Sequence, residues 1–369
     1  MRLVTDKAGL VESLTIVGRA VSSRSSIQVL SGVLLDCTGE RATLSATDME
    51  ISIKTPVSGR IEEPGSLVLP ARILTEIAKN LPSGRDVVLE QRTGESQVEV
   101  RAGESFFVLH SLPSADFPQF PIFPMDSGFT VEKTAFLATI DRVAPSASRD
   151  ETRPVLAGVL IHVAKNSVKM VATDSYRLSV KETTLTASVA ETVEAIVPAR
   201  SLTELSRIGA TNSADSITVV PSQNQIVFEV GGVWLVSRLI DGQFPNYHQL
   251  LPDAFEYEVG VDKAEILEVV RRVGLLAQKN APVRLRFADN TLTVSAESQD
   301  VGRARESISV HYEGEEIEIG FNPEFLEAGV NAVTDDTVLL KFISPLRPGL
   351  IQGAADDFLY LIMPIRLTD

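Results

Sequence analysis

The chain has 369 residues, more than one hydrophobic core usually serves, and 44% of them are apolar, so the sequence predicts a folded protein of two or three domains. Lys and Arg number 34 against 49 Asp and Glu, and the resulting net charge of −15 argues against a uniformly DNA-attracting surface. A single cysteine, Cys37, excludes an internal disulfide, and the lack of a long apolar run or basic leader favours a cytoplasmic protein without membrane spans.

In chain order, the predicted elements occur three times. Each copy begins with a segment of helical period, whose apolar positions are Leu10, Leu14 and Val17, then Phe136, Ile140 and Val143, then Ile266, Val269, Val270 and Val273. Short strands follow, and residues 97–102 and 225–230 alternate polar and apolar side chains, as half-exposed antiparallel strands do. A second, shorter helix is predicted after each strand set, ending with one at 323–333 in the third copy.

Three sequence anchors establish the repeat. The segment LSATDMEISI (44–53) has a near copy in MVATDSYRLSV (170–180) and a weaker one in TVSAESQDVGRA (293–304). LVLPARILTEI (67–77) recurs as AIVPARSLTEL (195–205) and more distantly as EIGFNPEFLEA (318–328). SFFVLHSLPSADFPQF (105–120) corresponds to VWLVSRLIDGQFPNY (233–247), and FLYLIMPIRL occupies the same place near the end of the sequence.

The anchors predict the domain organisation. Their order is constant and their separations are domain-sized, so we expect three similar α+β domains, each with two helices and antiparallel sheets. Proline and turn-forming residues place the boundaries so that the domains are 1–126, 127–254 and 255–369.

Cations recur in phase with the repeat, on the predicted helices or the turns beside them. Lys7 and Arg19 begin the series, and the candidates for DNA contact are Arg24, Arg72, Lys79, Arg142, Arg149, Arg200, Arg207, Arg271, Arg272 and Lys279. If the helices share one side of an assembly, these side chains form a stripe that contacts phosphates without reading bases. The alternative is ordinary solvated charge, since Glu12, Glu76 and Glu204 lie on the same helices.

No catalytic or metal-binding constellation is recognisable. Gly-rich phosphate loops, a nucleophile elbow and an H-E-x-x-H pair are missing, and the histidines are isolated from one another. Acidic doublets at 335–336 and 356–357 are typical of solvated turns. We therefore expect no catalytic residues, no metal and no cofactor, although an enzyme with its site at a domain junction stays open as an alternative.

Four strings in one order carry a resemblance: ATDSYRL (172–178), IDGQFPNYHQLLP (240–252), GFNPEFL (320–326) and LIMPIRL (361–367). Together with the threefold repeat, they resemble the bacterial β sliding clamps, the processivity subunits of the replicative DNA polymerase. The resemblance implies a non-catalytic DNA clamp fold of three tandem domains, closed as a head-to-tail homodimer into a ring around duplex DNA. A repeat-built binding scaffold unrelated to replication is the alternative.

The resemblance also implies partners and sites. Polymerase subunits, the clamp loader and repair proteins are expected to insert short linear motifs into a pocket between domains 2 and 3. Its residues are Leu156, Thr173, Ser175, Tyr176, Arg177, Leu178, Pro245, Gln249, Leu250, Asn322, Phe325, Leu346, Pro348, Leu361, Met363, Pro364, Ile365 and Arg366. The expected dimer interface brings Phe107 and Leu109 of one subunit against Leu275 and Leu276 of the other.

Overall fold

A computed structural model describes residues 1–22, 25–92, 94, 96–121, 123–124, 128–150, 152–185, 188–189, 192–252, 254–277, 281–298, 300–354 and 357–367. The chain folds into two compact units. Unit 1 comprises Met1–Leu137 and Arg200–Leu239, and unit 2 comprises Ala138–Ala199 and Ile240–Asp369. The predicted boundary at residues 126 and 127 lies outside the described residues.

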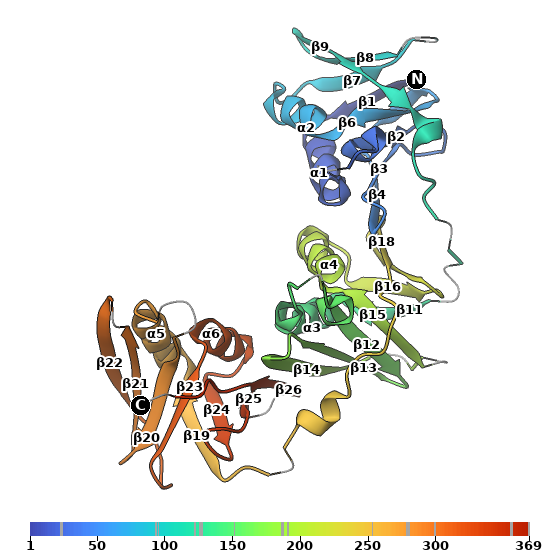
Figure 1. Ribbon diagram of the computed structural model, residues 1–369. Helices are drawn as coiled ribbons and strands as arrows, with labels where there is room; N and C mark the ends of the chain where they lie inside the picture. The colour runs from blue at the N-terminus through green and yellow to red at the C-terminus, as the bar shows by residue number, and fades with distance from the viewer. Residues whose placement is uncertain are drawn as a thin grey trace. The chain divides into compact units, whose positions relative to one another are not determined.

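The first sheet of unit 1 is built from the first repeat alone and is antiparallel (Figure 1). Its strands, in spatial order, are β5 (Arg60–Glu63), β1 (Arg2–Asp6), β7 (Asp86–Glu90), β8 (Gln97–Ala102) and β9 (Ser105–His110). In β8 the alternation is as predicted, because Val98 and Val100 are fully buried while Gln97 and Arg101 are exposed. Strand β9 lies at the edge of this sheet.

The second sheet of unit 1 joins strands of the first and second repeats. In spatial order they are β10 (Leu112–Pro113), β6 (Ser66–Pro70), β2 (Gly32–Asp36), β3 (Thr43–Thr47), β4 (Ile51–Pro56), β18 (Val233–Arg238), β17 (Gln225–Val230), β16 (Ser216–Pro221) and β11 (Phe129–Glu132). The junction is the antiparallel pair β4–β18, in which Lys54 lies opposite Trp234 and Ile53 opposite Leu235. Backbone hydrogen bonding therefore continues across the first domain junction.

Unit 2 repeats this arrangement with the second and third repeats. Its larger sheet runs β15 (Val193–Pro198), β12 (Gly158–Ala164), β13 (Ser167–Thr173), β14 (Arg177–Thr184), β26 (Phe358–Ile362), β25 (Gly349–Gly353), β24 (Thr337–Phe342) and β19 (Tyr257–Asp262). Its smaller sheet runs β22 (Gly302–Ser309), β21 (Thr291–Ser298), β20 (Val283–Ala288) and β23 (Ile317–Phe321). The junction pair is β14–β26, where Leu178 lies opposite Leu361. Strand β22 is an edge.

The helices confirm the predicted pair in each repeat. They are α1 (Lys7–Val17) with α2 (Ala71–Asn80), α3 (Lys133–Val143) with α4 (Ala199–Thr211), and α5 (Lys263–Gly274) with α6 (Pro323–Ala332). The apolar positions predicted for the first helices are buried; in α5 they join a core that includes Phe287, Phe321 and Phe342 from the sheet strands. Helix-period burial against a sheet is thus the architecture of every repeat.

Strand β17 departs from the predicted half-exposed pattern. Ile226 and Phe228 point into the core as expected, but Val227, on the opposite side of the sheet, is also fully buried. The reason is a small apolar cluster on that outer side, in which Phe120 and Phe123 pack near Val227 and Trp234. Phe120 and Phe123, near the end of the first domain, thus cover the outside of the sheet at Val227, which strand periodicity cannot reveal.

A lysine at the start of each first helix holds the end of the second helix, a repeated contact that the sequence reading missed. The Nζ of Lys7 donates to the carbonyl oxygen of Leu81 at 2.6 Å, just after α2, and Lys133 donates to Asn212 at 2.6 Å after α4. Lys263 donates to the carbonyl of Val333 after α6. These lysines satisfy carbonyls that a helix C-terminus leaves open, so Lys7 does not belong to the predicted phosphate-contacting stripe.

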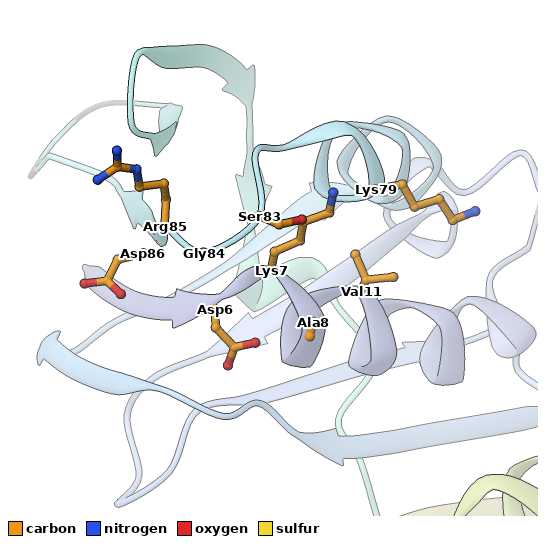
Figure 2. Close-up of a pocket in the computed structure, with 9 residues that line it drawn as sticks. All are labelled: Asp6, Lys7, Ala8, Val11, Lys79, Ser83, Gly84, Arg85 and Asp86. Atoms are coloured by element: carbon orange, nitrogen blue, oxygen red, sulfur yellow. The ribbon is translucent and has the colours of Figure 1, made fainter.

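Figure 2 shows the first of these contacts, with Lys7 rising from the start of α1 towards the loop that carries Ser83 and Gly84. A cavity of about 550 Å³ opens beside it, and Asp6, Lys79, Arg85 and Asp86 are among its lining residues. The cavity therefore lies between the two helices of the first repeat and is lined by both acidic and basic side chains.

An acidic residue precedes each lysine and caps the first helix. The Asp6 carboxylate accepts from the Gly9 N–H at 2.9 Å, and that of Glu132 accepts from Ala135 and Thr134 at 2.5 and 2.9 Å. These bonds, with the Gly9 and Ala135 amides contributing most, hold the pKa values of the Asp6 and Glu132 carboxyls below their usual range. An acid–lysine dipeptide is thus the repeated unit that closes each helix pair.

Replacing Lys7 by Met, which keeps the apolar stem, should weaken the end of α2. A charge-assisted hydrogen bond to a carbonyl contributes about 1.5–3 kcal/mol, so local opening of the last turn of α2 should become easier by an amount of that order. Hydrogen exchange at residues 77–81 measures it. Lys79→Met is the matched control, because its ion pair with Glu76 is exposed. Equal exchange in the two variants would contradict the role of Lys7 in holding the end of α2.

The capping carboxylates of Asp6 and Glu132 predict acid sensitivity. Because their folded pKa lies below the unfolded value of about 4, they stabilise the fold above that pH, and the contribution disappears as pH falls through the folded pKa. The melting temperature of Glu132→Gln should therefore lie below that of the wild type at pH 7 and approach it at pH 3. Glu12→Gln, on the exposed part of α1, should show no such convergence.

Candidate functional site

The turn between β13 and β14 is fixed by its own side chains. The Asp174 carboxylate accepts from the backbone N–H groups of Tyr176 and Arg177 at 2.9 and 3.0 Å, and the Thr173 hydroxyl accepts from that of Ser175 at 3.1 Å. Ser175 takes the left-handed conformation, with φ of 80°. The turn therefore presents Tyr176 and Arg177 in defined positions, as Asx turns do.

The first repeat builds the same turn. Asp48 accepts from the N–H groups of Glu50 and Ile51, and Met49 has φ of 76°. The T-D pair of the sequence anchor is therefore a turn device and needs no catalytic explanation. In the third repeat Gln299, in the corresponding turn, lies outside the described residues.

Arg177 ties this turn to α6. Its Nε donates to Asp174 at 3.1 Å, its Nη2 donates to the Pro145 carbonyl at 2.6 Å, and its guanidinium lies 4.5 Å from the ring centre of Phe325. Tyr176 stacks on Phe325 with ring centres 6.5 Å apart and is 61% exposed. The Tyr176 ring therefore packs against Phe325 on one side and is exposed to solvent on the rest of its surface.

The segment after β26 runs past this turn. The Met363 N–H donates to the Tyr176 carbonyl at 2.8 Å, and the Ile365 N–H donates to that of Gly320 at 2.8 Å. Met363 is 41% exposed, whereas Leu361, before it, is buried. Two backbone hydrogen bonds therefore fasten residues 363–365 between the hairpin turn and β23.

A cavity of about 580 Å³ opens next to Met363, entirely within unit 2. Its lining residues are Gln249, Leu250, Leu251, Pro252, Ala254, Ile343, Leu346, Arg347, Pro348 and Met363. Leu346 is 61% and Leu250 48% exposed. Exposed aliphatic side chains around a concave surface suit an apolar peptide anchor, and Arg347 adds one cation.

The predicted pocket residues divide into three groups. Gln249, Leu250, Leu346, Pro348 and Met363 line this cavity, and Tyr176, Arg177 and Phe325 form the aromatic group beside it. The remaining residues do not line the cavity: Thr173, Leu178 and Leu361 are buried, Leu156, Asn322, Pro364 and Ile365 are partly buried, and Ser175, Pro245 and Arg366 are exposed. Leu178 and Leu361 belong to a buried core, and Asn322 caps α6 through the N–H groups of Glu324 and Phe325.

Five lining residues were missed by the sequence reading: Leu251, Pro252, Ala254, Ile343 and Arg347. Each lies within a few residues of a predicted one, and 251–254 follow the 3-10 turn Tyr247–Leu250. For all but Ile343, the signal that could have found them is the concentration of Leu, Pro and turn formers at 249–254 and 344–349.

Two of the predicted interface residues lie on an edge strand, and the other two follow a helix. On edge strand β9, Phe107 is 38% exposed and Leu109 half-buried. Leu275, just after α5, is 83% exposed, and Leu276 follows it. Exposed edge strands with large apolar side chains invite pairing with another chain.

Of the eight predicted phosphate-contacting cations that lie among the described residues, five are paired with carboxylates. The pairs are Lys79 with Glu76 at 3.6 Å, Arg200 with Asp48 at 2.6 Å, Arg207 with Glu204 at 2.7 Å, Arg271 with Glu327 at 2.7 Å, and Arg272 with Glu268 and Glu306 at 3.1 and 2.8 Å. Glu204 also binds Arg19 at 2.8 Å. The pairing with Arg272 lowers the pKa of Glu306.

The other predicted cations differ. Arg72 and Arg149 are exposed and make no ion pair within the described ranges. Arg142 is half-buried, with its guanidinium 4.3 Å from the ring centre of Phe358. Arg24 and Lys279 lie outside the described residues. The predicted cations therefore fall into two kinds, those open to solvent and those balanced by a carboxylate of the protein.

Within the described ranges, no group of three His, Cys, Asp or Glu side chains could hold a metal ion. In the same part of the chain, no helix is long and apolar enough to cross a membrane.

Family models match the chain almost throughout. They are the DNA polymerase III beta subunit N-terminal domain over residues 1–121, central domain over 130–246 and C-terminal domain over 248–366. The beta sliding clamp of Streptomyces coelicolor is 34% identical, with all of both chains covered.

Solved structures agree. The DNA polymerase sliding clamp of Bacillus subtilis has a TM-score of 0.95 at 30% identity, and the DnaN sliding clamp of Pseudomonas aeruginosa bound to griselimycin has 0.93 at 28%. Each alignment covers all of both chains.

Proposed function

This chain belongs to the DNA polymerase III beta subunit family, the beta sliding clamps, and we propose that it closes as a head-to-tail homodimer around duplex DNA and tethers partner proteins there. It has three tandem clamp domains and the function of a replication clamp. The alternative of a scaffold unrelated to replication has no support from these relatives. We propose that the domains are 1–126, 127–254 and 255–369 and that the protein is non-catalytic and cytoplasmic.

The main support for the ring is the way in which equivalent strands of the three repeats pair. Strand β4 of the first repeat pairs with β18 of the second, and β14 of the second pairs with β26 of the third. By the same equivalence β22 and β9 should pair, yet each is a free edge. A second copy supplies the missing partner for both edges, with Phe107 and Leu109 against Leu275 and Leu276. A head-to-tail joint of this kind closes into a ring when the rotation fits.

The cavity at Met363 supports a peptide-binding role. Leu250, Leu346 and Met363 offer apolar walls, while Gln249 and Arg347 offer polar contacts to a peptide backbone or an acidic side chain. We propose that linear motifs of polymerases, the clamp loader and repair proteins bind there, with Tyr176 as an adjacent aromatic surface. Griselimycin, bound in the Pseudomonas aeruginosa structure, is proposed to bind this chain at the same place.

The balanced cations support sliding. An arginine that already has a carboxylate partner gains less from a phosphate than an open one does, because the internal pair must first be broken. Arg72 and Arg149 are proposed as the stronger phosphate contacts, and Arg200, Arg207, Arg271 and Arg272 as weaker ones. Topology then retains the DNA, and weak contacts leave the clamp free to move along it.

The proposed function is tested by loading the purified protein onto circular DNA with a clamp loader and ATP. A clamp should stay on the circle through gel filtration and be released when the DNA is cut once. Equal retention on circular and linear DNA would contradict encirclement, and a protein that is monomeric at micromolar concentration would contradict the ring.

Truncating an exposed pocket wall should weaken partner binding. For Met363→Ala or Leu346→Ala, loss of a buried apolar anchor contact should lower the affinity for a polymerase clamp-binding peptide about 10-fold or more. Fluorescence anisotropy measures this, and griselimycin should compete. Ile73→Ala, which truncates a half-exposed apolar side chain on α2, is the matched control and should bind normally. Unchanged affinity in both pocket variants would exclude this cavity.

Removing the carboxylate that restrains two arginines should tighten DNA binding. Glu204→Gln breaks the pairs with Arg19 and Arg207, so the slope of log affinity against log salt should steepen by roughly one to two, about one unit for each further phosphate that an arginine neutralises. Arg72→Ala should make it shallower. Glu316→Gln, whose partner Arg286 lies on β20, is the control and should leave the slope unchanged. A Glu204 variant with the wild-type slope would contradict the balancing role.

A further inference from the structure

Strand β9 exposes apolar side chains on both of its sides. Phe107 and Leu109 point to the same side as the buried Val98 and Val100 of β8. Phe106 and Val108 point to the opposite, outer side and are 55% and 45% exposed. An exposed aromatic on a sheet edge is a liability unless another chain covers it.

In the other two domains, the equivalent outer positions are covered. The hairpins β8–β9 and β17–β18 align Ser105 with Val233, so Phe106 and Val108 correspond to Trp234 and Val236. The latter two lie in the outer cluster with Phe120 and Phe123. In the third domain the corresponding residues of β26 are Leu359 and Leu361, which belong to an outer cluster closed by Tyr247 and neighbouring residues. The first domain alone, among described residues, leaves this side open.

The repeat fixes which residues should meet on the missing partner strand. Strand pairings place Ala46, Ala172 and Ala296 at one equivalent position. Across the adjacent hairpin these alanines lie opposite Ile53, Ser179 and Ala304. The residues that follow Ile53, Ser179 and Ala304 are therefore also equivalent, namely Lys54, Val180 and Arg305. The residues that precede them are equivalent as well, namely Ser52, Leu178 and Arg303.

The internal joints now give the register. Across β4–β18, Lys54 faces Trp234, Ile53 faces Leu235 and Ser52 faces Val236. Across β14–β26 the same positions face Leu359, Tyr360 and Leu361. Transferred to β22 and β9, Arg305 faces Phe106, Ala304 faces Phe107, and Arg303 faces Val108. A cation opposite an aromatic ring on the outer side already exists at the first junction, as Lys54 and Trp234.

We propose that Arg305 and Arg303 of one copy close over Phe106 and Val108 of the second, forming an outer latch on the subunit joint. The proposal rests on the proposed ring and adds its register and its outer contacts. Both arginines are exposed and make no ion pair within the described ranges, so their charge is available. Arg101 lies 5.3 Å from the ring centre of Phe106, so Arg305 would be a second cation at that ring.

The latch also distinguishes the two sides of the joint. The inner side is apolar, through Phe107, Leu109 and Leu275, whereas the outer side combines an aromatic ring with guanidinium groups. Salt weakens charge-based contacts and strengthens apolar burial, so the two sides respond oppositely to ionic strength. Arg305 thereby acts as a determinant of joint strength that partners of the outer surface could reach.

A disulfide test reads the register directly. The Arg238 N–H donates to Glu50 at 3.0 Å, so alternate positions such as Leu235 and Ile53 form the narrow, non-hydrogen-bonded kind of pair. Phe107→Cys with Ala304→Cys occupies that kind of site, with Cα atoms about 4.5 Å apart, suitable for a disulfide. Cys37 gives little background, because it is buried and burial raises its pKa to about 11.

Under mild oxidation this variant should give a dimer covalently closed at both joints. Phe107→Cys with Arg305→Cys, whose side chains project to opposite sides, and Phe107→Cys with Glu306→Cys, which reports a register shifted by two, are the controls. A dimer that links through Glu306→Cys and not through Ala304→Cys would overturn the register while leaving the ring intact. A protein without any dimer would overturn the ring itself.

The latch is tested by a double-mutant cycle on the dimer dissociation constant. Arg305→Gln and Phe106→Leu should each weaken the dimer, and a cation–aromatic contact at two joints corresponds to roughly 5- to 30-fold. The double variant should be no weaker than the more damaging single one. Arg286→Gln, elsewhere on the same outer surface, should dimerise as the wild type does. Additive effects of the two substitutions would overturn the latch.

Discussion

The structure depends on one constraint, which is that backbone groups at a sheet edge require partners. Each domain carries two edges at equivalent positions, and the chain satisfies the inner ones by pairing β4 with β18 and β14 with β26. Sheets thereby run through the domain junctions, and the compact units do not coincide with the repeats, because the second repeat contributes strands to both. The same rule leaves β9 and β22 open and makes a second copy the natural partner.

The threefold repeat was readable from the sequence because its anchors are local devices. Asp174 folds its turn by accepting two amides within three residues, and the prolines at 70 and 198 precede helices, so each leaves a short, ordered signature. The helices and the two strands at 97–102 and 225–230 could be predicted because their apolar side chains recur with a regular period. The contact between Lys7 and the end of α2 could not be predicted, because Leu81 lies far along the chain from Lys7. From sequence alone, a lysine in a helix is interpreted as a solvated charge. Likewise, the burial of Val227 depends on Phe120 and Phe123, which periodicity ignores.

The resemblance supplied the residues of the candidate site, but the sequence could not show which of their side chains are exposed and which are buried. Tyr176, Leu346 and Met363 are exposed as expected of a binding surface, while Leu178 and Leu361 are core residues. Charge shows the same limit. Phase along the chain picked out the cations, but only side-chain positions reveal that Glu204 holds two arginines at once. A net charge of −15 is compatible with contact with DNA because a few cations are open at particular places, while others are paired with carboxylates.

The unlike edges of β9 and β22 have a consequence for inheritance. Because each copy offers one edge of each kind, a subunit with a defective β9 still pairs through its sound β22 with a normal partner. The resulting mixed dimer has one closed joint and one gap, so it consumes a normal subunit without enclosing DNA. A lesion on one edge of this protein would therefore act dominantly in a cell that also makes the intact chain.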